Sequence, residues 1–356
     1  MFSSIHETPK FVKPESSIFL AQKAMIRFCF LLFSFLTPTL LQAQDYLHLI
    51  GKIGADSVIL DVSNFQKRLK GFYYSLHSAE EGFLEGEQTG NQQYAIRLYV
   101  KEQLKGKLSL EGKLTDLQGL MDSGSRKDSA RFRSETIHSC QFRLVSSNLS
   151  DSVNQTNCSV NVNLLIPTTF RKKTLPDFIS DSLIPSSIVK NSEQFAESIL
   201  SDFRENAKSI DTELHLHYSY TAMPVYNHNG LLCYQKRSYN YVGGETGVEE
   251  NIYTIFDLYS GKRYTFESIF PESEARYKLS ILLDLKLHQE FPDIDGIKIL
   301  TVSKEFRFSR NGIYFYYKPS EVGLYSLETL ELLIPFSDLK PLLAKDHPFQ
   351  WISEKP

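Results

Sequence analysis

The chain has 356 residues, of which 42% are hydrophobic and 23% are charged. This balance is typical of a globular protein that is long enough for two domains, and it excludes an intrinsically disordered chain. The formal net charge of −3, with Lys and Arg scattered along the chain, argues against a nucleic-acid-binding protein, which would carry a basic patch.

The amino-terminal segment has the layout of a secretory signal peptide. Arg27 supplies a positive charge before an apolar run at residues 28–36, and the small residue Ala43 fits a cleavage site. The run is too short to cross a hydrocarbon core of ~30 Å. We therefore expect residues 1–43 to be a signal peptide and translation to begin at Met25. We also expect the mature chain to be secreted or periplasmic, without a transmembrane anchor.

The next segment, residues 44–147, is predicted to be an all-β antiparallel meander domain. Short runs of apolar or alternating residues occur at residues 47–51, 57–62, 71–76, 94–100 and 107–112. Glycine-containing turns separate these runs at short spacing, which favours hairpins over crossover helices. The 25 Phe and 19 Tyr of the chain also favour half-buried sheet surfaces.

Residues 148–157 are rich in Ser and Asn and poor in apolar residues, so we expect a linker there. Cys140 and Cys158 lie on the strand-like runs beside this segment. An oxidising compartment would permit a disulfide between them, and two buried thiols are the alternative. Cys233 would then remain as a core residue.

The remainder, residues 158–350, is predicted to be an α+β domain, an antiparallel sheet with two main helices. Asn191 can cap a helix on which Phe195, Ile199 and Phe203 recur at four-residue steps. A second helix is expected from Ser273 until Pro292 stops it. Strands are expected at residues 212–220, 231–242, 251–258, 306–308, 313–317 and 330–334. Because strands and helices do not alternate strictly, the helices should cover one sheet face.

No set of residues in the chain indicates catalysis. His215 and His217 would share one strand face, but a third metal ligand is missing nearby. The segment Asp293-Ile294-Asp295-Gly296 resembles the start of a calcium loop without its closing glutamate. A Gly-x-Ser-x-Gly nucleophile motif is absent from the sequence. We therefore predict no enzymatic activity, no metal and no cofactor.

Several tyrosines are candidates for a binding surface. Tyr239 and Tyr241 lie on one predicted strand, and Tyr316 belongs to the aromatic run at residues 314–317. Exposed tyrosines are favoured at interfaces, because they bring contact area with little loss of conformational entropy. The alternative is that alternate tyrosines pack in the core.

Six short motifs occur in a recognisable order in the second half of the chain. They are Tyr241-Val-Gly243-Gly244, Phe256-Asp257-Leu258, Ser260-Gly261-Lys262, Ser268-Ile-Phe270, Phe308-Ser-Arg-Asn-Gly312-Ile-Tyr-Phe315 and Ile334-Pro335-Phe-Ser-Asp338-Leu339. In this order and spacing, residues 159–343 resemble the extracytoplasmic domain that RsiV-type anti-sigma factors share with some peptidoglycan deacetylases. The function of that module is generally unknown.

The resemblance implies a non-catalytic binding or accessory protein of the cell envelope. In RsiV-type proteins the domain recognises lysozyme, and in the deacetylases it accompanies a separate catalytic domain whose metal-binding motifs this chain lacks. The expected partner is therefore a lysozyme-like protein or a peptidoglycan-type glycan, and not a nucleic acid. The alternative is a glycan-processing hydrolase or deacetylase that uses carboxylates without a recognisable motif.

One departure from the family concerns the double-glycine turn. The family commonly has Gly-Gly-Ala-His-Gly, whereas this chain has Gly243-Gly244-Glu245-Thr246-Gly247, so a role for the histidine does not carry over. The glycines should occupy backbone positions that need a positive φ or a close approach. Together with Tyr239, Tyr241 and Tyr316, we take Gly243 and Gly244 as the candidate binding residues.

Overall fold

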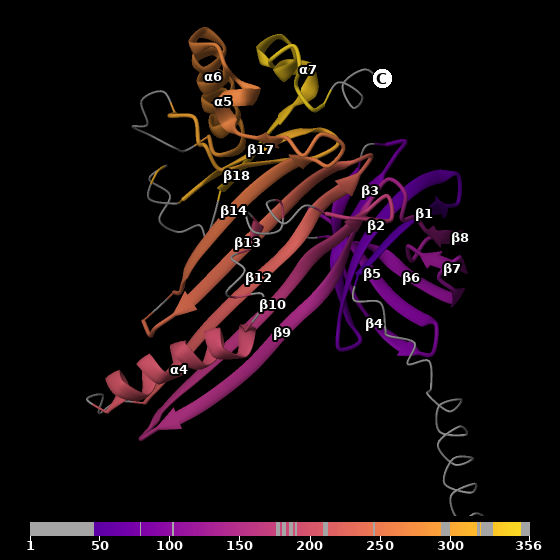
Figure 1. Cartoon of the computed structure of the whole chain (residues 1–356). Coiled ribbons are helices and arrows are strands. Elements are labelled where there is room, and N and C mark those ends of the chain that lie inside the picture. Colours follow the sequence, from indigo (N-terminus) through magenta and orange to yellow (C-terminus); the bar gives the residue numbers. More distant parts are fainter. Residues whose placement is uncertain are drawn as a thin grey trace, which may run out of the picture. The chain divides into compact units, whose positions relative to one another are not determined.

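The structure is a computed structural model. It describes residues 46–349 except 79, 102, 176–178, 180–182, 185–187, 189–190, 209–212, 245, 293–299, 319–320 and 322–329. The predicted signal peptide and the predicted start at Met25 lie outside the described residues. The described residues belong to one compact unit, Gln44–Pro356. Within that unit, an all-β part is followed by an α+β part (Figure 1).

The first eight strands form a closed antiparallel barrel, in which each strand pairs with the next and β1 also pairs with β8. The strands are β1 Tyr46–Ile53, β2 Asp56–Phe65, β3 Arg68–Ser75, β4 Glu81–Gly90, β5 Gln93–Val100, β6 Gln103–Lys113, β7 Asp116–Asp122 and β8 Lys127–Ser134. Alternate residues point inward, so that Leu60, Leu98 and Leu108 are fully enclosed in the barrel interior. The predicted meander is confirmed, and its ends join.

A second sheet contains seven strands. Six of them follow the order β11-β10-β12-β13-β14-β15, and the seventh, β9, also pairs with β10. The strands are β9 Cys140–Val153, β10 Thr156–Phe170, β11 Lys173–Thr174, β12 Leu214–His228, β13 Leu231–Tyr241, β14 Val248–Asp257 and β15 Arg263–Tyr264. β10 and β12 run parallel, and the other pairs are antiparallel. Asn229 and Gly230 both have positive φ and form the tight turn between β12 and β13.

The prediction of a linker at residues 148–157 is wrong. These residues form the end of β9, a turn and the start of β10, and β9 begins before the predicted end of the first domain. Their apolar content is low because only alternate side chains, such as Leu149 and Val153, pack against a core. The Ser and Asn side chains at the alternating positions, Asn148, Ser150, Ser152 and Asn157, face away from it.

Helix α4, Ser192–Ala207, covers one face of this sheet over β9 and β10 (Figure 1). It buries Ala196, Leu200, Phe203 and Ala207 in a core that includes Val160 and Val162 of β10. The predicted helix after Asn191 is confirmed. Two of the predicted core residues, Phe195 and Ile199, are only half-buried. The residues that follow them, Ala196 and Leu200, are buried instead.

The carboxy-terminal part adds a small sheet with helices. Its elements are α5 Phe266–Ile269, α6 Ser273–Glu290, β16 Phe306–Phe308, β17 Gly312–Tyr317, β18 Leu330–Pro335, α7 Phe336–Leu339 and the 3-10 helix Lys340–Leu342. Leu279 and Leu283 of α6 pack with Phe315 and Leu332 of the small sheet in one core. Cys233 and Ile255 of the large sheet join that core. The predicted α+β architecture with two main helices is confirmed.

Of the two alternatives for Cys140 and Cys158, the disulfide does not form, because the register of β9 and β10 keeps the two cysteines apart. Cys140 pairs with Phe170, whereas Cys158 pairs with Asp151. The twelve residue steps along β10 from Cys158 to Phe170 span roughly 40 Å at about 3.3 Å per residue, far beyond bridging distance. Cys140, Cys158 and Cys233 are buried free thiols.

Candidate functional site

The face of the large sheet opposite α4 is lined by polar side chains over β9, β10, β12, β13 and β14. Side chains alternate between the faces of each strand, so the apolar residues that alternate with these on β9 and β10 lie under α4. We call this surface the open polar face, and its residues are exposed or half-buried. They are Ser146, Asn148, Ser150, Ser152, Asn157, Ser159, Asn161, Asn163, His215, His217, Ser219, Thr221, Arg237, Tyr239, Tyr241, Glu249 and Asn251.

Neighbouring side chains on the open polar face hold one another in place. Ser159 Oγ lies 2.8 Å from His217 Nδ1, and the His217 ring lies 6.2 Å from the Tyr239 ring. Across the next strand pair, Arg237 forms an ion pair with Glu249 at 2.5 Å. These contacts position hydrogen-bonding groups and an aromatic ring on a rigid strand surface, which suits recognition of a polar ligand.

The double-glycine turn closes one end of this face. Gly243 and Gly244 have φ values of 96° and 100°, in the region that glycine adopts without strain. Tyr241 donates its hydroxyl proton to the carbonyl oxygen of Gly244 at 2.9 Å. A Cβ added at Gly247 would lie 2.5 Å from Tyr239 Cζ, so this glycine allows the ring to approach the backbone. The glycines have the predicted backbone roles, and whether they bind a ligand stays a prediction.

The structure places Tyr316 apart from the other candidate residues. Its side chain is only 6% exposed and stacks on Tyr253 with ring centroids 4.6 Å apart. The Tyr316 hydroxyl accepts a hydrogen bond from Arg307 Nε. Tyr239, Tyr241, Gly243 and Gly244 therefore lie together at one end of the open polar face, whereas Tyr316 packs beneath the surface.

His215 and His217 lie on the open polar face, as their spacing predicts. Asn157 and Ser159 of the neighbouring strand lie next to their rings. Among the residues that the structure describes, no group of three or more His, Cys, Asp or Glu side chains is placed to hold a metal ion. The segment at residues 293–296 that resembles a calcium loop lies outside the described residues.

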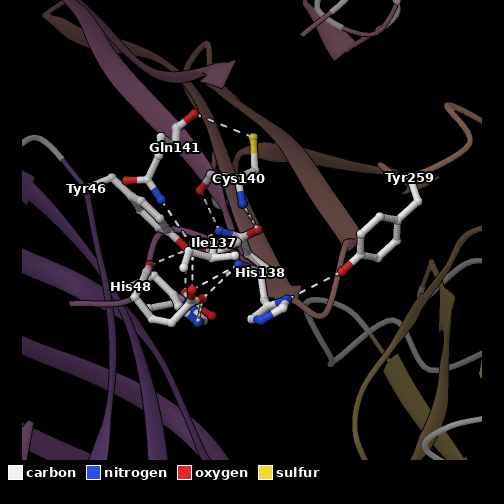
Figure 2. Close-up of polar contacts among 11 residues, drawn as sticks. Tyr46, His48, Ile137, His138, Cys140, Gln141 and Tyr259 are labelled. Atoms are coloured by element: carbon white, nitrogen blue, oxygen red, sulfur yellow. Dashed lines mark hydrogen bonds and ion pairs between the residues drawn. The ribbon is translucent and has the colours of Figure 1, made fainter. Parts of the chain in front are cut away.

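A second polar cluster lies where barrel strands β1 and β2 meet the end of β12 (Figure 2). Asp61 Oδ1 accepts hydrogen bonds from Tyr46 Oη at 2.5 Å and from His48 Nδ1 at 2.6 Å. Asn227 Nδ2 donates to Tyr46 Oη and to the carbonyl oxygen of Cys140, both at 2.8 Å. We call Tyr46, His48, Asp61 and Asn227 the junction network, because they connect the barrel to the second sheet.

The His48–Asp61 pair has the geometry of a general base with its orienting carboxylate. However, His48 is 1% exposed and Asp61 is 2% exposed, so a substrate cannot reach the pair in this structure. Burial and the charge of Asp61 raise the pKa of Tyr46, so its hydroxyl remains a donor. The junction network therefore joins two parts of the fold and does not form an active site.

Sequence reasoning missed most of the open polar face and all of the junction network. The face had a usable signal, because polar and apolar residues alternate strictly from Asn157 to Leu164. The network had none, since Tyr46 and Asn227 are 181 positions apart. Within the described part of the chain, none of the helices has the length and apolar character needed to cross a membrane.

Comparisons with known proteins identify the fold only. No protein-family model matches the chain, and no curated protein matches it. Among solved structures, the chain is similar to a DUF3298 family member from Bacteroides fragilis NCTC 9343, with a TM-score of 0.50 and 18% identity. That match covers 62% of this chain and 99% of the other. A DUF3298 family protein from Pseudomonas aeruginosa PAO1 matches with a TM-score of 0.42, 17% identity and coverage of 58% and 95%. The first likeness supports a DUF3298-type fold.

Proposed function

We propose that this chain is an exported, non-catalytic binding protein of the cell envelope and that its open polar face binds a peptidoglycan-type glycan. The observation that carries the proposal is the composition of that face, in which five adjacent strands present Ser, Asn, Thr, His and Tyr side chains to solvent. Hydroxyl and amide groups both donate and accept hydrogen bonds, as the hydroxyl and acetamido groups of a glycan require.

The open polar face also carries an aromatic ring, that of Tyr239 on β13. Tyr239 offers an apolar ring with a polar tip, which suits a sugar ring that has apolar and hydroxylated surfaces. Its ring is held between His217 and Gly247 and is therefore pre-organised. A shallow and rigid surface of this kind fits an extended polymer better than a small molecule, which is usually enclosed in a concave pocket.

The resemblance to RsiV-type extracytoplasmic domains points to the same compartment and to the same partner classes. The DUF3298-type fold is compatible with an accessory role. A lysozyme-like protein is the alternative ligand that this resemblance implies, and a glycan-processing enzyme is the alternative activity. The extended row of Ser and Asn side chains favours the glycan.

We predict that Tyr239→Ala weakens binding to insoluble peptidoglycan roughly tenfold, because truncation of a central aromatic anchor typically costs more than 1 kcal/mol. The measurement is co-sedimentation of the chain from Gln44 to Pro356 with increasing amounts of peptidoglycan. Tyr277→Ala is the matched control, because Tyr277 is 58% exposed on α6, away from the open polar face. This control should bind like the wild type.

The experiment has three outcomes that contradict the proposal. If the wild type is not retained by peptidoglycan but binds a lysozyme, the ligand is a protein. If both variants bind like the wild type, the open polar face is not the binding surface. If mass spectrometry shows altered glycan after incubation, the chain is an enzyme.

A further inference from the structure

The other face of the large sheet is apolar beneath the amino-terminal end of α4. There the structure contains a cavity of about 160 Å³ that is partly open to solvent. Its walls are almost entirely apolar and include Leu164, Phe195, Tyr220, Ala222 and Ile252. The cavity exists because α4 covers β9 and β10 and reaches β12 through the Phe195–Tyr220 contact, but leaves β13 and β14 less covered.

Lys236 supplies the single ammonium group in the lining of this cavity. It lies on β13 between Ala222 of β12 and Ile252 of β14, so its stem is among apolar neighbours. No described residue forms an ion pair with its ammonium group within 4.0 Å. Burial lowers the pKa of Lys236, and the positive charge of Arg263 lowers it further, while Glu250 and Glu305 oppose these effects.

The size and chemistry of the cavity define the class of ligand. A cavity of about 150 Å³ with apolar walls can hold one benzene ring, and this one has a similar volume. An anionic group at its mouth would give the Lys236 ammonium the partner that the described residues do not supply. Glu250 at the rim would disfavour a ligand with several negative charges.

We propose that this cavity binds a small amphiphilic carboxylate, with its aromatic or short aliphatic end among the apolar walls and its carboxylate paired with Lys236. The cavity is separate from the open polar face, because Lys236 alternates along β13 with Arg237, whose side chain pairs with Glu249 on the other face of the sheet. The inference therefore goes beyond the proposed glycan binding and does not depend on it.

Calorimetric titration with 3-phenylpropionate and with its neutral amide tests the proposal on the chain from Gln44 to Pro356. The acid should bind at least about tenfold more tightly than the amide, because only the acid can pair with Lys236. Lys236→Met keeps an unbranched apolar side chain and should remove this preference. Lys113→Met, an exposed lysine of the barrel, is the matched control and should keep it.

A filling variant and a spectroscopic measurement locate the site. Ser238→Phe places a ring at the cavity lining and should prevent binding of both compounds. Chemical-shift changes on adding the acid should centre on the methyl groups of Leu164 and Ile252 in the wild type, which needs no variant. Four results would each overturn the proposal. The acid and the amide could bind equally well, or Lys236→Met could keep the preference for the acid. The chemical-shift changes could lie elsewhere in the protein, or the acid could fail to bind at concentrations up to about 10 mM, in the range of weak association.

Discussion

Replacing Asp61 by leucine should lower the free energy of unfolding by about 3–5 kcal/mol, the cost of removing one partner from a buried ionic cluster. Asp61 accepts hydrogen bonds from both Tyr46 and His48, and all three side chains are almost fully buried. The substitution would leave a hydroxyl and an imidazole N–H without acceptors inside the fold. Each buried donor without a partner costs about 1–3 kcal/mol.

Urea unfolding of the chain from Gln44 to Pro356 measures this effect. Asp116→Leu is the matched control, because Asp116 forms an exposed ion pair with Arg131 on the same barrel. Such pairs contribute less than about 1 kcal/mol. A loss below about 1 kcal/mol for Asp61→Leu would contradict the assignment of a buried network. In a Tyr46→Phe background the loss should be smaller, since one of the two donors is already gone.

The junction network also joins the barrel to the second sheet. Asn227 donates to Tyr46 of the barrel and to the carbonyl oxygen of Cys140 in the second sheet, and the backbone N–H of Cys140 donates to Asn227 Oδ1. Around these polar contacts, Tyr74 of the barrel packs on Tyr226 of β12. The junction therefore combines directional hydrogen bonds with apolar packing, which fixes the barrel at the end of β12.

Much of the fold followed from local patterns in the sequence. Alternating runs and glycine turns predicted the meander, four-residue apolar steps predicted α4, and the helical stretch from Ser273 to the stop at Pro292 predicted α6. Barrel closure did not follow, because it depends on pairing between Leu49 of β1 and Ser134 of β8, which no local pattern encodes. The linker prediction failed for a different reason. Low apolar content predicts a loop, whereas a strand with one solvent-facing side needs apolar residues only at alternate positions.

The candidate site was predictable where chemistry and local structure coincide. The double-glycine turn placed Tyr239, Tyr241, Gly243 and Gly244 together, because they are close in sequence. Tyr316 belongs to a separate small sheet, where a residue on an alternating aromatic strand can face either a core or solvent. Its partners Tyr253 and Arg307 decide that it is buried, and both come from other strands. The sequence does not predict that Lys236 lines a cavity, because the cavity depends on how far α4 covers the sheet.

The second large effect concerns pH. Burial lowers the pKa of His228 to about 4, and the positive charges of His48, Arg310 and His138 act in the same direction, while Asp61 opposes them. The unfolded chain binds a proton at the ordinary histidine pKa of about 6.5, whereas the folded chain binds it only near pH 4. Stability that is complete above pH 6.5 is therefore lost as the pH falls towards 4, by about 3 kcal/mol at pH 4.

The contribution of His228 can be separated from those of the other titrating groups by comparing the wild type with His228→Gln. The glutamine variant keeps a polar side chain but cannot titrate, while carboxylates and exposed histidines contribute equally to both proteins. The wild type should lose about 3 kcal/mol of unfolding free energy relative to the variant between pH 7 and pH 4, with about 2 kcal/mol of this already lost at pH 5. His48 stacks on His228 with ring centroids 5.7 Å apart, so the loss acts directly at the junction network. Parallel pH profiles for the two proteins would show that His228 takes up its proton equally well in the folded and unfolded chains, and the junction would then not be acid-sensitive through this residue.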